Sequence, residues 1–178
     1  MKLIVGLGNP GKNYARTRHN AGFIALDLLL KKISPDRSWE LSKKFNAEIA
    51  TVATKNGRVI LAKPMTFMNA SGQAVQLLAH YHKVNPPDII VIHDDKDLSL
   101  GTHKIQTDRG AAGHNGVISI FTHLKTQNIV RVRLGIASES GKKIPDTADF
   151  VLKNFGLLEK RRFLTAVDSA LTELQRMI

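Results

Sequence analysis

Four segments of the chain carry polar side chains that could do chemistry. The first holds Asn9 and His19, the second is 65–69, the third is 93–97, and the fourth is 113–116. A neutral histidine can act as a general base near pH 7, and a carboxylate can hold it in one tautomer. Asparagine amides can bind or polarise a carbonyl group without bringing charge. These residue types are suited to a reaction in which an activated water attacks an ester or amide.

The same segments admit other interpretations. Gly6, Gly8 and Gly11 match the G-x-G-x-x-G pattern of dinucleotide-binding folds. That pattern also needs an acid about 20 residues further on, at a strand end, whereas the nearest acid, Asp27, falls within an expected helix. The acids at 94–97 could form a solvated turn or bind magnesium, although no second carboxylate cluster exists. The absence of a G-x-S-x-G elbow argues against a serine esterase. Taken singly, the histidine could be a surface residue and the asparagines turn or cap residues.

A framework of alternating strands and helices is expected to position these segments. Strands are predicted at 2–5, 47–54, 58–63, 89–92 and 129–136, and helices at 21–32, 71–82, 116–125 and from 158 to the end. We expect Asn20 and Ser71 to cap helices, Asn56-Gly57 to close a hairpin, and 33–44 to be a loop. This order predicts a single α/β domain, 1–178, with a twisted mixed sheet flanked by helices. Its core is parallel and its hairpin strands antiparallel. Ligands of such sheets bind at the carboxyl ends of parallel strands, where the polar segments fall.

The composition limits the class of function. The 178 residues include 26 Lys and Arg against 15 Asp and Glu, a net charge of +11, which favours a polyanionic partner such as RNA. The chain has no cysteine, which excludes disulfides, thiolate metal sites and a cysteine nucleophile. The apolar run at the N-terminus is too short for a signal peptide, and no segment reaches the roughly 20 apolar residues of a membrane span. A soluble, cytoplasmic protein is expected.

Taken together, the polar segments resemble the bacterial-type peptidyl-tRNA hydrolase family. The matching stretches are 6–11, Tyr14 with 17–22, 63–64, 66–69 with 71–72, 93–95 with 97–98, 113–116, Arg131 and Arg133 with 134–136, and 151–152 with Phe155. They cover nearly the whole chain in order. Each stretch is weak by itself, but so many in register are specific.

The resemblance implies an activity and a role for each matching residue. The family hydrolyses the ester between peptide and tRNA, releasing tRNA from peptides that ribosomes have dropped. It acts as a monomer on the tRNA acceptor end, with no metal and no cofactor. His19 would then be the general base and Asp94 would stabilise its working form. Asn9 would distinguish N-blocked from free aminoacyl-tRNA. The peptide or terminal nucleotide would be held by Asn69 and Asn115, with Tyr14 and Phe67 lining the same site.

This chain also departs from the family pattern. The segment 107–112 replaces a glycine-rich run, Gln106 stands where a lysine is often found, and Lys96 replaces a usual leucine. Phosphate contacts are therefore harder to assign. The candidates are Lys104, Arg109, Arg131 and Arg133, with possible help from Lys160, Arg161 and Arg162, and each of them could instead lie on a solvated face. The alternatives left open are a non-catalytic RNA-binding protein on the same fold, a nucleotide-dependent oxidoreductase, and a general esterase or peptidase.

Overall fold

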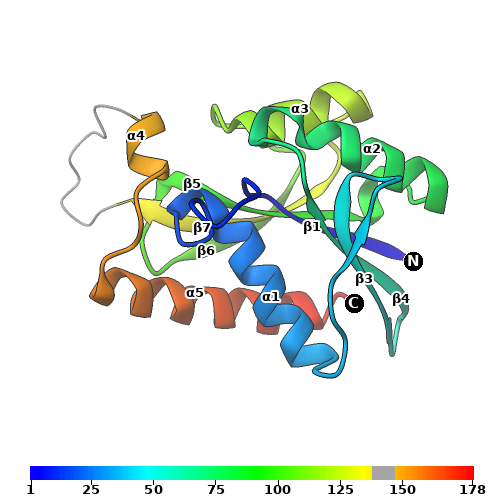
Figure 1. The fold of residues 1–178 in the computed structure, drawn as a ribbon, viewed down its shortest axis with the longest axis horizontal. Helices are drawn as coiled ribbons and strands as arrows, with labels where there is room; N and C mark the ends of the chain where they lie inside the picture. The colour runs from blue at the N-terminus through cyan, green and yellow to red at the C-terminus, as the bar shows by residue number, and fades with distance from the viewer. Residues whose placement is uncertain (138–146) are drawn as a thin grey trace.

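The computed structural model describes residues 1–137 and 147–178, which form a seven-stranded sheet with helices on both faces (Figure 1). The strands are β1 (Lys2–Gly6), β2 (Glu40–Ser42), β3 (Ala47–Thr54), β4 (Gly57–Pro64), β5 (Ile89–Ser99), β6 (His103–Thr107) and β7 (Val130–Ala137). The helices are α1 (Ala21–Ile33), α2 (Ser71–His82), α3 (Asn115–Leu124), α4 (Thr147–Val151) and α5 (Leu157–Gln175), with 3₁₀ turns η1 (Arg18–Asn20), η2 (Met68–Ala70) and η3 (Pro86–Asp88). The predicted α/β fold with a mixed sheet is confirmed.

The middle of the sheet is parallel and its margins are antiparallel. The strand order is β2-β3-β4-β1-β5-β7-β6, in which β4, β1, β5 and β7 run parallel. The strands β2, β3 and β6 pair antiparallel with their neighbours. The predicted hairpin joins β3 to β4, and Gly57 adopts a φ of 118°, which a side chain would disfavour.

Two hydrophobic layers cover the central strands. Successive side chains of a strand point to opposite faces, so an uninterrupted apolar run is buried on both. On β5, Ile90 and Ile92 pack in the layer made with α1 and α5, whereas Ile89 and Val91 pack in the layer made with α2 and α3. Figure 1 shows α1 and α5 on one side of the sheet and α2 and α3 on the other. Within the described residues, none of the helices has the length and apolar character needed to cross a membrane.

Glycines bring the start of α1 directly against the sheet. A Cβ added to Gly22 would overlap the carbonyl oxygen of Ile92 and the backbone nitrogen of Leu7. A Cβ on Gly6 would in turn overlap the carbonyl oxygen of Gly22, and one on Gly8 would meet the ring of Phe23. The glycine run therefore allows helix packing, and α1 begins only well beyond it. The dinucleotide-binding pattern is not completed in this fold.

Several local predictions were wrong. The expected loop 33–44 contains β2, and the short elements β6 and α4 were not predicted. Neither expected cap forms: the amide of Asn20 bonds the backbone of Asn9, and Ser71 is already the first residue of α2. Short edge strands with mixed polar residues show little periodicity in the sequence, because pairing with a neighbouring strand determines whether such a segment forms a strand.

Candidate active site

A cavity of about 520 Å³ opens where β1 and β4 end, beside the second half of β5. It is lined by six of the predicted site residues, Asn9, His19, Phe67, Asn69, Asp94 and Asn115. The other lining residues are Met68, Asp95, Lys96, 111–114, and Thr147, Ala148, Val151 and Leu152 at α4. The structure thus brings all four polar segments of the sequence to one place.

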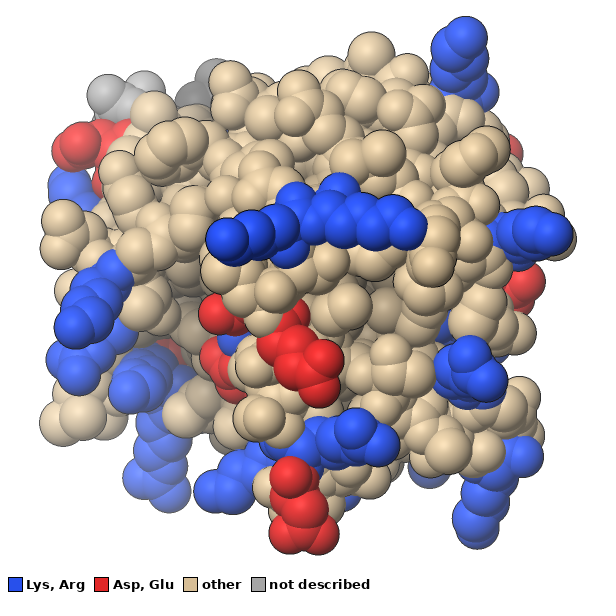
Figure 2. All heavy atoms as spheres, turned by 45° about the vertical axis from the view of Figure 1, so that its right-hand side comes forward, with Lys and Arg blue, Asp and Glu red and all other residues tan. Residues whose placement is uncertain are grey.

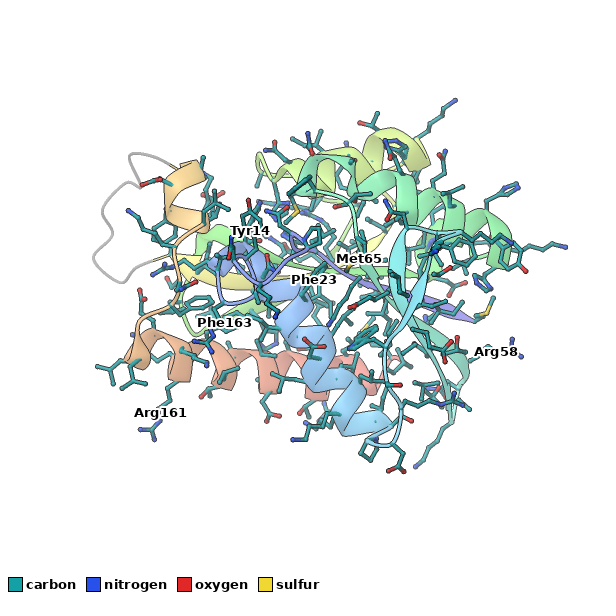
Figure 3. The ribbon with its side chains drawn as sticks, in the orientation of Figure 1. Tyr14, Phe23, Arg58, Met65, Arg161 and Phe163 are labelled. Atoms are coloured by element: carbon teal, nitrogen blue, oxygen red, sulfur yellow. The ribbon has the colours of Figure 1, made fainter. Side chains whose placement is uncertain are left out.

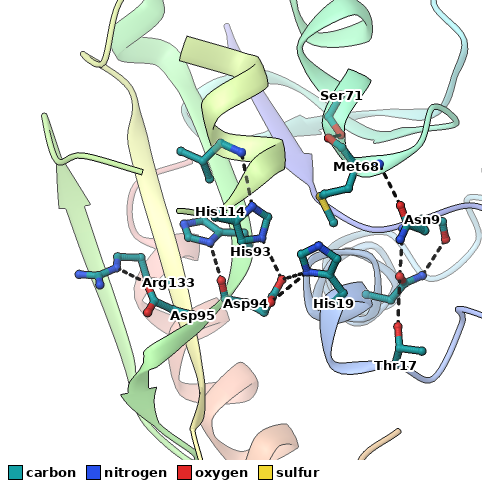
Figure 4. A network of polar contacts seen from close by, with 12 residues as sticks. Asn9, Thr17, His19, Met68, Ser71, His93, Asp94, Asp95, His114 and Arg133 are labelled. Atoms are coloured by element: carbon teal, nitrogen blue, oxygen red, sulfur yellow. Dashed lines mark hydrogen bonds and ion pairs between the residues drawn. The ribbon is translucent and has the colours of Figure 1, made fainter. Parts of the chain in front are cut away.

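The centre of the cavity is a hydrogen-bonded group of two histidines around one carboxylate (Figure 4). Nδ1 of His19 lies 3.0 Å from each carboxylate oxygen of Asp94. Nε2 of His114 lies 3.0 Å from Oδ1 of the same carboxylate. The two imidazole rings are 4.9 Å apart. His19 stands on η1, Asp94 on β5, and His114 immediately before α3, so three separate elements form the group.

The hydrogen-bond partners determine where the ring protons lie. The backbone N–H of Val117 donates to Nδ1 of His114 at 3.4 Å, so a neutral His114 carries its proton on Nε2 and donates it to Asp94. Asp94 also accepts from Nδ1 of His19. In a neutral His19 ring, Nε2 is then unprotonated and available as a base. This is the tautomer that general-base attack of water requires.

Asp94 is almost completely buried and remains ionised because of its two partners. Burial alone would raise the pKa of the Asp94 carboxyl, but the charges and hydrogen bonds of His114 and His19 outweigh it and hold the pKa well below its usual range. The carboxylate is therefore the fixed negative charge against which the working histidine is oriented.

His93 supports the group from inside the sheet. Its Nδ1 donates to the carbonyl oxygen of Asp94 at 2.7 Å, and its ring packs edge-on against His114 at 4.8 Å. The other nitrogen, Nε2, lies 3.4 Å from a guanidinium nitrogen of Arg131, which donates to it. Burial, together with the charge of His114, lowers the pKa of His93 well below its ordinary value. His93 is thus held as a neutral side chain that packs behind His114 and Asp94.

Asn9 is oriented with its amide nitrogen free for a ligand. Its Oδ1 accepts from the backbone N–H of Met68 at 2.9 Å, which only an oxygen can do. The side chain of Asn20 bonds both backbone groups of Asn9, at 3.0 and 2.9 Å, and fixes the loop. Nδ2 of Asn9 is therefore the atom left to donate to a carbonyl group.

Of the remaining predicted ligand-binding residues, Phe67, Asn69 and Asn115 line the cavity, whereas Tyr14 does not line it and lies beside Phe67. Asn69 and Asn115 are exposed, and Phe67 is 60% exposed. The ring of Tyr14 meets Phe67 edge-on, with centroids 6.4 Å apart. An exposed aromatic side chain held by a second ring is suited to stacking on a nucleobase.

The basic residues require a correction. Arg131 and Arg133 were expected on an exposed basic face of their strand, but they are only 1% and 6% exposed. Arg131 donates to the carbonyl oxygens of Arg109 and Gly110, both at 2.8 Å. Arg133 donates to Asp95 at 2.7 Å and to Gln106 at 2.5 Å. The alternation of arginine and apolar residues along β7 therefore does not produce an exposed basic face, because both faces of the strand are covered. Arg131 instead holds the loop at 109–110 in place, and Arg133 holds the carboxylate of Asp95.

The other basic candidates are exposed but do not line the cavity: Lys104, Arg109, Lys160, Arg161 and Arg162. In Figure 3, Arg161 points away from the fold on α5. Lys and Arg side chains are scattered over the face shown in Figure 2, with acidic side chains between them. On that face, the positive net charge does not gather into one patch.

Arg18 connects the catalytic turn to α4, a connection that the sequence did not reveal. This residue, next to His19, is only 6% exposed. Its guanidinium donates to the carbonyl oxygen of Asn154 at 2.8 Å and to the carboxylate of Glu159 at 2.7 Å. It also lies over the ring of Phe150, 4.6 Å from the centroid. The wall of the cavity that α4 forms is thereby tied to the turn that carries His19.

Among the described residues, one group of side chains has the composition and spacing of metal ligands. The ligand atoms of His19, Asp94 and His114 lie within 4.8 Å of one another. Both nitrogens that face the carboxylate are donors in the hydrogen-bond pattern described above, and their 3.0 Å separations suit N–H···O contacts. Metal ligation needs unprotonated nitrogens about 2 Å from the ion. The arrangement therefore fits a proton-transfer site better than a metal site.

Sequence reasoning missed the parts played by His114, His93 and Arg18, although all three stand within or beside the matching motifs. A histidine directly before a predicted helix, in a segment already expected near Asp94, was the available signal for His114. The other two depend on contacts between segments far apart in the chain, for which the sequence offered no signal.

Comparisons with known proteins show which family the chain belongs to. The family model described as peptidyl-tRNA hydrolase matches residues 3–178. A peptidyl-tRNA hydrolase from Mycoplasma mycoides is 49% identical over 136 residues, covering 76% of this chain and 72% of the relative. One from Mycobacterium ulcerans is 44% identical over 168 residues, covering 94% and 86%. The crystal structure of the Acinetobacter baumannii peptidyl-tRNA hydrolase superimposes with a TM-score of 0.90 at 34% identity, covering 98% of this chain and 87% of that one.

Proposed function

Because the chain belongs to the peptidyl-tRNA hydrolase family, we propose that its cavity hydrolyses the ester between peptide and tRNA by general-base catalysis through His19. In this mechanism Nε2 of His19 takes a proton from water, and the resulting hydroxide attacks the ester carbonyl. The free 3′-hydroxyl of tRNA and the peptide carboxylate are the products. The observation that carries the proposal is the contact of both oxygens of Asp94 with Nδ1 of His19, which leaves Nε2 unprotonated.

Asp94 has two tasks in this mechanism. It selects the working tautomer before the reaction, and it stabilises the imidazolium that forms when His19 accepts the proton. His114 assists as a positioning residue, because its Nε2 hydrogen bond holds the carboxylate in place. A general base of this kind contributes about 10²–10⁴-fold to the rate.

Neutral amides and a helix end surround the expected position of the ester. Nδ2 of Asn9 is free to donate to a peptide carbonyl, which accounts for discrimination between N-blocked and free aminoacyl esters. Asn69 and Asn115 border the cavity and are available to hold the peptide or the terminal nucleotide. α3 begins at Asn115, and the positive end of its helix dipole favours developing negative charge on the carbonyl oxygen.

The tRNA end is proposed to enter past Tyr14 and Phe67. A nucleobase stacked on the exposed Phe67 ring would place the 3′-terminal ribose near His19, since both residues line one cavity. The exposed Lys104 and Arg109 remain candidates for phosphate contacts, which would make binding salt-dependent. Arg131 and Arg133 are excluded from this part because their guanidinium groups are occupied inside the fold.

The test compares N-acetyl-aminoacyl-tRNA with the unblocked aminoacyl-tRNA. Wild type should cleave the blocked substrate, and His19→Ala should lower kcat by about 10²–10⁴-fold with little change in tRNA affinity. The matched control is His80→Ala, which removes an exposed histidine of α2 outside the cavity. Binding of tRNA by wild type without cleavage of either substrate would instead support a non-catalytic RNA-binding protein.

A further inference from the structure

Lys96 is the one Lys or Arg among the residues that line the described cavity. The two carboxylates beside it are buried and already hydrogen-bonded, Asp94 to two histidines and Asp95 to Arg133, so little of either is presented at the surface of the cavity. The remaining lining side chains are apolar groups, amides, the two histidines and the hydroxyl of Thr147, so none of them is a lysine, an arginine or an acid. The ammonium group of Lys96 is therefore the charge that the cavity presents to a substrate.

The backbone around Lys96 is built to present this side chain. The pairing of β5 with β7 shifts register between Asp95 and Ser99, and such irregularities re-aim side chains beside active sites. One oxygen of Asp95 accepts from the backbone N–H of Asp97 at 2.9 Å, and the other accepts from Arg133 at 2.7 Å. Lys96 thus lies between Asp95, which is held by its buried ion pair with Arg133, and Asp97, whose backbone N–H is held by Asp95.

The ammonium group itself is only weakly engaged. Nζ of Lys96 lies 3.4 Å from Oδ1 of Asp97, whose side chain is 55% exposed, whereas that of Lys96 is 36% exposed. An exposed pair of this kind contributes little and is easily exchanged for a better-placed anion. Ala111, Val151 and Leu152, which line the same cavity, add apolar surface that would lower the hydration of a bound anion.

The position of Lys96 within the cavity points to the peptide. The proposed base-stacking residue, Phe67, precedes Met68, which lies on the Asn9 side of His19 in Figure 4. Asp95, the neighbour of Lys96, lies on the opposite side of His19. If the nucleobase occupies the aromatic end, the peptide extends from the ester toward Lys96. The phosphates of the acceptor strand then lie on the far side of the catalytic histidine.

We propose that Lys96 forms an anion-binding subsite that favours peptidyl-tRNA with an acidic residue, Asp or Glu, near the ester. This inference rests on the proposed function and adds a preference among its substrates.

The experiment uses one tRNA that carries N-acetyl-dipeptidyl esters with Glu or Gln in either of the two peptide positions. For each position, the readout is the ratio of kcat/KM for the Glu substrate to that for the Gln substrate at low ionic strength. Wild type should favour Glu by about twofold to fivefold in at least one position. Lys96→Leu should bring this ratio to about one, and Lys96→Arg should preserve most of it. Lys31→Leu, which removes an exposed lysine of α1, is the control for net charge and should keep the wild-type ratio.

Two results would overturn the subsite. A wild-type ratio near one in both positions would show that acidic peptides are not preferred. An equal loss of kcat/KM for Glu and Gln substrates in Lys96→Leu, with the ratio unchanged, would show that the lysine contacts a phosphate of the tRNA instead. Failure of wild type to cleave even the Gln substrates would contradict the proposed hydrolase function itself, which separates the two tests.

Discussion

Replacing Asp94 by asparagine should leave the cavity intact but place the proton on the wrong nitrogen of His19. Both carboxylate oxygens of Asp94 lie 3.0 Å from Nδ1 of His19. With the amide oxygen at the Oδ1 position, where it accepts from His114, the NH₂ group takes the Oδ2 position, 3.0 Å from Nδ1 of His19. A protonated Nδ1 faces this donor as well as the amide oxygen, whereas an unprotonated Nδ1 accepts a hydrogen bond from it. The substitution therefore favours the ring with its proton on Nε2, the nitrogen that must accept a proton from water.

His114 cannot change its tautomer to relieve this conflict. The backbone N–H of Val117 donates to Nδ1 of His114, so the neutral ring keeps its proton on Nε2 and continues to need an acceptor at position 94. The amide oxygen satisfies His114, and the amide nitrogen is left against His19. A wrong tautomer of this type costs about 10⁴ in kcat in a serine protease, and we expect a loss of about 10²–10⁴, or about 3 to 5 kcal/mol of activation free energy.

The assay is single-turnover hydrolysis of N-acetyl-aminoacyl-tRNA by wild type, Asp94→Asn and the control Asp88→Asn. Asp88 is an acid of η3 outside the cavity, with a side chain 43% exposed and paired with Lys2 at 3.4 Å. KM should change little in both variants. If Asp94→Asn retained kcat within tenfold of wild type, the tautomer argument would be refuted.

Asp94→Asn should also alter the stability of the protein toward acid. The pKa of Asp94 is lowered in the folded protein, so its ionisation stabilises the fold fully above the ordinary carboxyl pKa of about 4. That contribution is lost as the pH falls below about 4 toward the folded pKa. The variant should therefore lose stability at pH 7 and show a shallower decline of the unfolding free energy below pH 4.

Three further predictions concern residues that support the site. Burial lowers the pKa of His93, so below about pH 6.5 the unfolded chain binds a proton that the folded chain does not. The free energy of unfolding therefore falls as the pH is lowered from 6.5 to 5, by up to about 1.4 kcal/mol per pH unit, and His93→Gln should reduce this fall. Ala112 has a φ of 50°, in the left-handed region that disfavours a side chain. Ala112→Gly should therefore raise the free energy of unfolding, measured by urea denaturation, by up to about 1 kcal/mol. No gain would show that this conformation is unstrained. Arg18→Met should lower the free energy of unfolding by about 1 to 3 kcal/mol, because the carbonyl oxygens of 153 and 154 lose their donor, and it should raise KM more than it lowers kcat, because α4 loses its anchor. An unchanged KM would contradict this role.

The sequence predicted the parts of the fold that are locally encoded. The apolar run at 89–92 indicated a strand buried on both faces, and Asn56-Gly57 indicated a hairpin, because burial and positive φ are properties of the residues themselves. The polar segments at the carboxyl ends of parallel strands were likewise brought together, as chain topology requires.

What the sequence could not predict depends on partners distant in the chain. The alternation of Arg131 and Arg133 with apolar residues is the same for a solvated basic face and for a buried network. The difference depends on the hydrogen-bond acceptors that the fold brings to the two arginines: Asp95, Gln106 and the carbonyl oxygens of residues 109 and 110. The contact of His114 with Asp94 likewise joins a helix start to a strand.

The tautomer of His19 tests the central claim most directly. Two-bond ¹H–¹⁵N correlation spectra of the wild-type protein near pH 8, assigned with His19→Gln, report which ring nitrogen carries the proton. We predict a proton on Nδ1 and a bare Nε2 in wild type, with the opposite arrangement in Asp94→Asn. A wild-type His19 protonated on Nε2 would contradict the assignment of this residue as the base that activates water.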